Sequence, residues 1–386
     1  MTGITNCISI FAYDPRAFDG LRAVAYLLIF ALHARFFAFG WVGVQFFFVL
    51  SGFLITGILL DMKQSLPTAG YFVKFYGRRF LRIFPLYYLY LFLMLGITTW
   101  LISIRYRPSY METTPEQVRY AFLYGYNFML ATVKHEPAFY LEHLWSLSLE
   151  EQFYVIWPLL ILLLPQKHLK GFFLSLIALG PLFRVAFTLV HATGEFRIFH
   201  PNVAEALYPL PFTHVDAFAF GAFISRYKIP RAREQFFLLA GAVPLIGFAA
   251  QYFATGSIGD ISALGYPLLM AQGGQYIWGY SLLNYFFAVI IQAVASQGLF
   301  NRFLEWAPMR YLGKISYGLY IYHQPILWFA FDIRELGVDP NLVQPLAAMI
   351  GFFGTLLVAS LSYHFFEKPI LNLKDRYLPM KTGRHP

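Results

Sequence analysis

The sequence predicts an all-α polytopic membrane protein with about ten transmembrane helices. Hydrophobic residues make up 58% of the 386 residues and charged residues only 13%, whereas an ordinary soluble protein has about 25% charged residues. Apolar stretches recur along the whole chain, at the length of about 20 residues that a helix needs to cross a bilayer. We expect the spans near 20–39, 42–61, 84–104, 143–164, 171–191, 208–226, 235–254, 275–296, 313–333 and 343–365.

The distribution of basic residues predicts that both termini are cytoplasmic. Most of the 29 Lys and Arg residues fall in segments that share one side when the N-terminus lies inside, as the positive-inside rule requires. We therefore attribute the net charge of +9 to membrane orientation and not to nucleic-acid binding. The single cysteine, Cys7, excludes an internal disulfide framework and a cysteine metal site. With no internal repeat or linker, we expect one domain over residues 1–386.

The first two spans contain charge where lipid tolerates little. Arg22, His33 and Arg35 interrupt the apolar stretch 21–60, and a charge at mid-membrane costs about 2.5 to 3.5 kcal/mol unless it faces a cavity or a partner. On one helix, Arg22 and His33 are about three turns and about 16 Å apart, so they share a face. We expect Arg22 at one membrane surface and His33 about halfway through the hydrocarbon core.

This spacing suits a ligand whose anionic end stays at the surface while its reactive end reaches inward. An imidazole can take a proton from a hydroxyl near neutral pH, so His33 is a candidate general base. A hydrogen-bonded packing role is the usual alternative for a buried histidine. Arg35 lies about 200° around the helix from His33, and we interpret it as an outer-edge residue.

The connection 61–84 is basic and aromatic, and it predicts an amphipathic interfacial segment. Arg78, Arg79 and Arg82 lie in it, on the side where we expect Arg22. Two interpretations remain open. The cluster can anchor the chain by the positive-inside rule, or its guanidinium groups can bind the phosphates of a ligand bidentately.

The fourth span begins with His143, Ser146 and Glu150, all candidates for lining an internal site. Glu150 follows His143 by about two turns, which places both on one face about 10 Å apart. A carboxylate there needs a partner. It either forms an ion pair with an Arg of another span, or it belongs to an acceptor-binding or proton-relay site open to the outer side.

Two later spans carry further ionisable residues. Asp216 in the sixth span either lines the pathway or pairs with Arg184 of the fifth span. In the ninth span, His323 lies about 13 Å beyond Lys314, near the expected depth of His33. A packing role and a lining role for His323 are equally compatible with the sequence.

Several motifs are absent from the sequence. It contains no Walker sequence, no dinucleotide-binding glycine pattern and no His-Glu-x-x-His, so nucleotide hydrolysis and zinc proteolysis have no support, and we expect no metal. The segment 51–53, Ser-Gly-Phe, lacks a nucleophile elbow and predicts close helix packing instead.

Together these features resemble the acyltransferase-3 family of integral membrane O-acyltransferases. Arg22 and His33 match the family pattern of an Arg, ten residues and a His in the first span. Further matching segments are GVQFFFVLSGFLIT (43–56), FYGRRFLRIFPLYY (75–88), HLWSLSLEEQFYVIWP (143–158), ISYGLYIYHQPI (315–326) and FEKP (366–369). One departure is Gln45, where many relatives carry an Asp.

The resemblance implies a multi-pass protein of the bacterial inner membrane that transfers an acyl group, commonly acetyl, from cytoplasmic acyl-CoA to a carbohydrate or glycolipid hydroxyl. On this basis we expect His33, Arg22 and Glu150 to be catalytic. We expect Arg22, Arg78, Arg79 and Arg82 to bind the donor's phosphates, and His143, Ser146, His323 and Asp216 to line the acceptor site or tunnel. His33 would either deprotonate the acceptor hydroxyl or carry the acyl group transiently. Some relatives carry a fused extracytoplasmic hydrolase-like domain, which we do not expect here.

Two other classes of protein, a flippase and a membrane scaffold, account for part of the sequence. A glycolipid or polysaccharide-precursor flippase would use the intramembrane charges to line a pathway, but the sequence shows no paired halves of the inverted-repeat kind. A membrane scaffold that binds anionic lipid would explain the basic segment 78–82. It leaves the buried Arg22 and His33 without a role.

Overall fold

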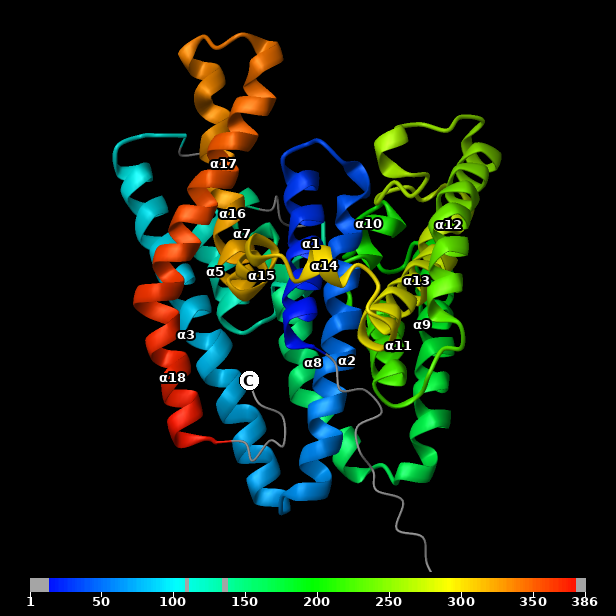
Figure 1. Cartoon of the computed structure of the whole chain (residues 1–386). Coiled ribbons are helices and arrows are strands. Elements are labelled where there is room, and N and C mark those ends of the chain that lie inside the picture. The colour runs from blue at the N-terminus through cyan, green and yellow to red at the C-terminus, as the bar shows by residue number, and fades with distance from the viewer. Residues whose placement is uncertain (1–13, 108–110, 134–137, 380–386) are drawn as a thin grey trace, which may run out of the picture.

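The computed structural model describes residues 14–107, 111–133 and 138–379 as a bundle of helices that run roughly parallel to one another (Figure 1). Within these residues, seven helical segments are long and apolar enough to cross a membrane. They contain α2 (Val42–Ser65), α3 (Thr68–Ser103), α8 (Leu144–Leu163), α9 (Leu169–Ala192), α12 (Ala232–Thr255), α13 (Gln275–Gln297) and α17 (Pro340–Ser362). The predicted class, an all-α polytopic membrane protein, is confirmed.

Three further helices correspond to the remaining expected spans, and they are shorter or more polar. They are α1 (Pro15–His33), α11 (Val215–Arg226) and α16 (Ser316–Ala330). Most residues of α11 and α16 are buried. These helices therefore form the interior of the bundle, where other helices shield them from lipid.

The first helix ends at His33, earlier than the sequence suggested. The chain turns because Arg35 adopts a left-handed conformation, with φ of 63°. The amides of Ala34, Arg35 and Phe36 then bond back to carbonyls of the last helical turn, a common way for a helix to end. His33 is consequently the last residue of α1, not a residue halfway along it.

The expected interfacial segment is part of a transmembrane helix. α3 continues without a break from Thr68 to Ser103, with Pro85 inside it. Arg78, Arg79 and Arg82 therefore project from the first half of a long helix, and the same rigid element carries them into the bundle.

The long connection 105–142 folds back onto the bundle through the short helices α5 (Thr114–Phe122), α6 (Tyr126–Leu130) and α7 (Phe139–Glu142). Tyr87 of α3 donates a hydrogen bond to the carbonyl of Ala121 at 2.8 Å. Gln117 accepts hydrogen bonds from Tyr126 and from the amide of Ala138, each at 2.8 Å. The described parts of this connection, residues 111–133 and 138–142, are therefore packed against the bundle.

Glycines bring α2 and α11 into close contact, as the Ser-Gly-Phe segment predicted. A Cβ atom at Gly52 would lie 2.1 Å from the carbonyl oxygen of Phe218, and one at Gly221 would lie 2.0 Å from that of Val49. Only glycine permits this approach, which resembles small-residue packing between membrane helices.

The C-terminal helix α18 (Lys368–Tyr377) packs beside α3, and both are visible along one edge of Figure 1. It follows α17 through one π-helical turn, Tyr363–Glu367. Arg78 of α3 donates a hydrogen bond to the carbonyl of Leu378 at 2.8 Å and forms an ion pair with Asp375 at 3.1 Å. These contacts hold α18 against the basic part of α3.

Candidate active site

A cavity of about 320 Å³ opens among α1, α2, α3, α8, α16 and α18. Its wall combines cations, acids, hydroxyl groups and apolar side chains. The cations are Arg22, Arg78, Arg79, Arg82 and Lys374; the other polar lining residues are Ser51, Ser146, Glu150, Glu151, Tyr154, Ser316, Tyr317 and Tyr320. The structure thus brings together the four arginines that the sequence proposed for donor binding.

The cations of this cavity are only partly neutralised. Arg22 donates to Asp19 at 2.6 Å, while Arg79 lies over the ring of Tyr154 at 5.3 Å. Among the described residues, no carboxylate lies within ion-pair distance of Arg79 or Arg82. Glu150 and Glu151 face these two arginines without pairing with them, and five cations line the cavity with two acids, so this wall is suited to an anionic ligand.

Glu150 lies in the same cavity as the arginines. Its Oε1 atom accepts a hydrogen bond from Ser51 at 2.7 Å, and Ser51 is also 3.3 Å from the hydroxyl of Tyr154. The neighbouring Glu151 is buried, and its Oε1 atom has no hydrogen-bond partner. Both acids therefore face the basic cavity, although the sequence alone suggested an outer-side location for Glu150.

Three histidines cluster beyond the inner end of the cavity. His33 ends α1, His143 immediately precedes α8, and His323 lies within α16. The ring centres of His33 and His323 are 4.9 Å apart, and those of His143 and His323 are 5.4 Å apart. His33 Nδ1 lies 3.0 Å from His323 Nε2, and His33 Nε2 lies 3.0 Å from the Gln324 amide nitrogen.

Ser146 and Tyr320 separate the cavity from this cluster. Their hydroxyl groups are 2.6 Å apart, and Tyr320 also donates to the carbonyl of His143 at 3.0 Å. Both residues line the cavity, whereas His33, His143 and His323 do not. Arg22 and His33, which the sequence places on one face of one helix, thus lie on opposite sides of a closed Ser146–Tyr320 contact.

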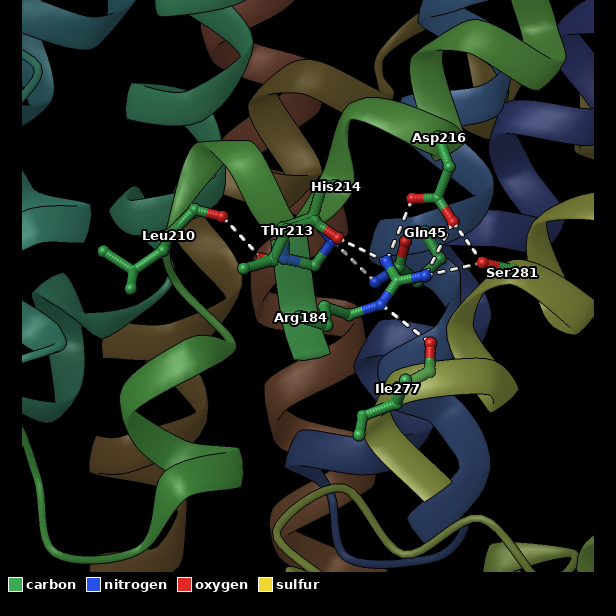
Figure 2. Close-up of polar contacts among 8 residues, drawn as sticks. All are labelled: Gln45, Arg184, Leu210, Thr213, His214, Asp216, Ile277 and Ser281. Carbon is green, nitrogen blue, oxygen red and sulfur yellow. Dashed lines mark hydrogen bonds and ion pairs between the residues drawn. The ribbon is translucent and has the colours of Figure 1, made fainter. Parts of the chain in front are cut away.

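Asp216 lies away from the cavity and pairs with Arg184, as the ion-pair alternative proposed (Figure 2). Both side chains are fully buried. All five N–H groups of Arg184 have acceptors: both carboxylate oxygens of Asp216, the carbonyls of Ile277 and Thr213, and the hydroxyl of Ser281. This network ties together α9, α11, α13 and the short η3 helix (Pro211–His214).

Gln45, where the family resemblance led us to expect an Asp, has a partner in the same region (Figure 2). Its amide nitrogen lies 2.9 Å from His214 Nδ1, and His214 Nε2 donates to the carbonyl of Tyr208 at 2.6 Å. His214 therefore accepts from Gln45 as a neutral imidazole, and this site needs no acid.

Sequence reasoning missed three residues of the site. Lys374 reaches the cavity from α18, Ser51 bonds Glu150, and Gln324 bonds His33. Gln324 directly follows His323 and could have been suspected from that position. Lys374 and Ser51 could not, because only the packing of distant helices brings them to the cavity. Within the described ranges, no group of three or more His, Cys, Asp and Glu residues has the arrangement to hold a metal ion.

Comparisons with known proteins agree with this architecture. A family model described as an acyltransferase domain matches residues 16–364. The peptidoglycan O-acetyltransferase OatA of Listeria monocytogenes is 30% identical over 375 residues, which cover 93% of this chain and 56% of that protein. The O-acetyltransferase OatA of Staphylococcus aureus strain NCTC 8325 is 29% identical over 391 residues, which cover 96% of this chain and 60% of that protein.

The chain thus spans less than two thirds of the length of these curated relatives. No solved structure matches it significantly. The family match nevertheless extends over nearly the whole helical bundle and includes the histidine cluster and every cavity residue except Lys374. The chain therefore belongs to the acyltransferase-3 family of integral membrane O-acyltransferases.

Proposed function

We propose that this protein transfers an acyl group, most simply acetyl, from acyl-CoA to a hydroxyl group of a carbohydrate acceptor in the cell envelope. The observation that carries the proposal is the cavity, in which five cations lie at one end and a Ser146–Tyr320 contact against the histidine cluster lies at the other. A thioester on a long, phosphorylated carrier has a shape and charge that complement this site.

The donor would enter from the cytoplasm with its phosphates against the arginines. Arg79 and Arg82, which form no ion pair among the described residues, would contribute most, since guanidinium groups bind phosphate oxygens bidentately. Lys374 adds a fifth positive charge from α18. The pantetheine arm would then run past apolar side chains such as Phe47 and Leu54 toward Tyr320.

His33 would act once the Ser146–Tyr320 contact opens. The acceptor oxygen attacks the thioester carbonyl carbon, a C–O bond forms and the C–S bond breaks. The hydroxyl proton passes to His33 and then to the departing thiolate, which leaves as the CoA thiol. If His33 instead carries the acyl group, the same bonds form and break in two steps, and the kinetics become ping-pong.

The names of the relatives support a proposal for the acceptor. The Listeria monocytogenes relative is named a peptidoglycan O-acetyltransferase, which favours a peptidoglycan sugar hydroxyl as the acceptor here too. Its place would be the outer side of the bacterial inner membrane, where His143 would help to position it. Glu150 would act from within the donor cavity, which it lines. Arg22, in the first half of α1, would help to bind the donor.

Two measurements test this proposal. Mass spectrometry of envelope glycans from cells with and without the protein should find an O-acyl group that disappears with the gene. In purified protein, Arg79→Gln with Arg82→Gln should weaken acetyl-CoA binding by at least about tenfold, because charge-assisted hydrogen bonds contribute about 1.5 to 3 kcal/mol each.

Arg233→Gln provides a matched control, because Arg233 is exposed at the start of α12 and away from the cavity. It should leave acetyl-CoA affinity unchanged. Equal affinities for acetyl-CoA in the wild type and the double variant would contradict the proposed donor site. Unchanged glycans in cells without the gene would contradict the proposed reaction.

A further inference from the structure

The hydrogen bonds around His323 determine which nitrogen of each ring carries a proton. His323 Nδ1 lies 2.7 Å from the carbonyl oxygen of Tyr320. A carbonyl only accepts, so His323 Nδ1 must be the protonated nitrogen. In a neutral ring, His323 Nε2 then has a lone pair and can only accept.

The same reasoning extends to His33. The only polar contact of His323 Nε2 among the described residues is His33 Nδ1, at 3.0 Å. The His33 ring also contacts the backbone carbonyl of Ile29, one turn earlier in α1, and both acceptors favour a proton on His33 Nδ1. The lone pair of neutral His33 is therefore on Nε2, which accepts from the Gln324 amide at 3.0 Å. One directional chain thus runs from Gln324 through His33 and His323 to a backbone carbonyl.

We propose that His323 is a positioning residue that fixes His33 in the Nδ1–H form and so makes Nε2 the basic atom. This inference rests on the proposed function and assigns His323 a role other than tunnel lining. The carbonyl that orients His323 belongs to Tyr320, whose hydroxyl group bonds Ser146 at the inner end of the cavity. The donor cavity and the orientation of the base therefore share one residue.

Gln324 occupies the position that the acceptor hydroxyl must take. The Gln324 side chain is buried, and its Oε1 atom has no hydrogen-bond partner. The acceptor O–H displaces the amide and gives its proton to His33 Nε2. The Nδ1–H bond of His33 remains directed at His323, and the proton on Nε2 then passes to the departing thiolate.

The test compares substitutions that keep or lose an acceptor at the position of His323 Nε2. A glutamine Oε1 atom can occupy that position, whereas an asparagine side chain is too short. His323→Gln should retain transfer within about fivefold of the wild type. His323→Asn and His323→Ala should lower kcat by about 100-fold, within the range of a lost general-base contribution.

If His323 had only a structural role, its substitution would change acetyl-CoA affinity as well as the rate of transfer. Acetyl-CoA affinity should stay the same in the three variants, because His323 does not line the cavity. Only the unfolding temperature should fall with the size of the side chain removed, most in His323→Ala. Tyr26→Phe is the matched control: Tyr26 packs edge-on against His323 at 6.1 Å, and its hydroxyl has no hydrogen-bond partner. This variant should transfer acetyl at the wild-type rate.

Nitrogen-15 NMR of ring-labelled histidine gives an independent readout. The signals of His33 are assigned as those that are absent from the His33→Ala spectrum. In the wild type they should show the Nδ1–H form, and in His323→Ala they should shift toward the Nε2–H form. If the Gln, Asn and Ala variants at position 323 all transfer acetyl at the same rate, whatever that rate is, the inference is overturned. An Nε2–H form of His33 in the wild type overturns it as well. If His33→Ala itself transfers at the wild-type rate, the proposed function fails instead.

Discussion

At the scale of single residues, the Arg184–Asp216 pair illustrates how this protein accommodates buried charge. The two side chains are fully buried, and each N–H group of Arg184 has an acceptor. Removing one partner leaves the other as a buried charge with no opposite charge beside it. Such a change typically costs about 3 to 5 kcal/mol.

Arg184→Met and Asp216→Leu should therefore each destabilise the protein strongly, while the double variant should recover part of the loss because no lone charge remains. Unfolding temperatures in detergent measure this effect. A double variant whose loss equals the sum of the single losses would contradict the account of the pair.

Sequence reasoning works for residues whose role follows from local position. The pairing of Asp216 with Arg184 could be proposed because two opposite charges lay within adjacent apolar spans. Arg22 and His33 could be placed on one face because both belong to one helix. The closed contact between Ser146 and Tyr320 could not be predicted, since it joins two side chains that lie 174 residues apart in the chain.

At the scale of helices, glycines let α2 and α11 approach more closely than Cβ atoms would allow. Gly52→Ala should destabilise the protein by about 1 to 3 kcal/mol, because its Cβ atom would lie 2.1 Å from the backbone oxygen of Phe218. Chemical or thermal unfolding of the purified protein measures the change.

Gly57→Ala is the control on the same helix, since a Cβ atom there meets no neighbouring atom within 4 Å. It should be neutral or stabilise α2 by up to about 1 kcal/mol through helix propensity. If both alanine variants had equal stability, glycine packing would not be what joins α2 to α11.

The existence of the helices was predictable from hydropathy, but their ends were not. Every expected span corresponds to a helix, since length and apolar content alone select such segments. α1 nevertheless ends at His33, because Arg35 adopts a left-handed backbone that hydropathy does not register. α3 absorbs the basic segment because nothing between Thr68 and Pro85 interrupts the helix.

At the scale of the whole molecule, the proposed reaction requires the cavity to open toward the cytoplasm. The first half of α3 and the helix α18 lie toward the end of the bundle where α2 joins α3 (Figure 1). These two segments contribute Arg78 and Lys374 to the cavity wall. The positive-inside rule predicts that this end is cytoplasmic.

A green fluorescent protein fused to the C-terminus should therefore fluoresce, and alkaline phosphatase inserted between residues 255 and 274 should be active. The first reporter works only inside the cell and the second only outside. The reverse result would mean that the basic cavity does not open toward the cytoplasm, where acyl-CoA is found. In that case a flippase would become the better explanation.

The central claim is that His33 is the base in acyl transfer, although it lies outside the cavity in which the acyl-CoA donor binds. The most direct test measures both quantities on purified His33→Ala: affinity for acetyl-CoA, and transfer of radiolabelled acetyl to a peptidoglycan fragment. We predict wild-type affinity, since His33 does not line the donor cavity, and a loss of transfer of at least about 100-fold. Transfer at the wild-type rate by His33→Ala would contradict the account.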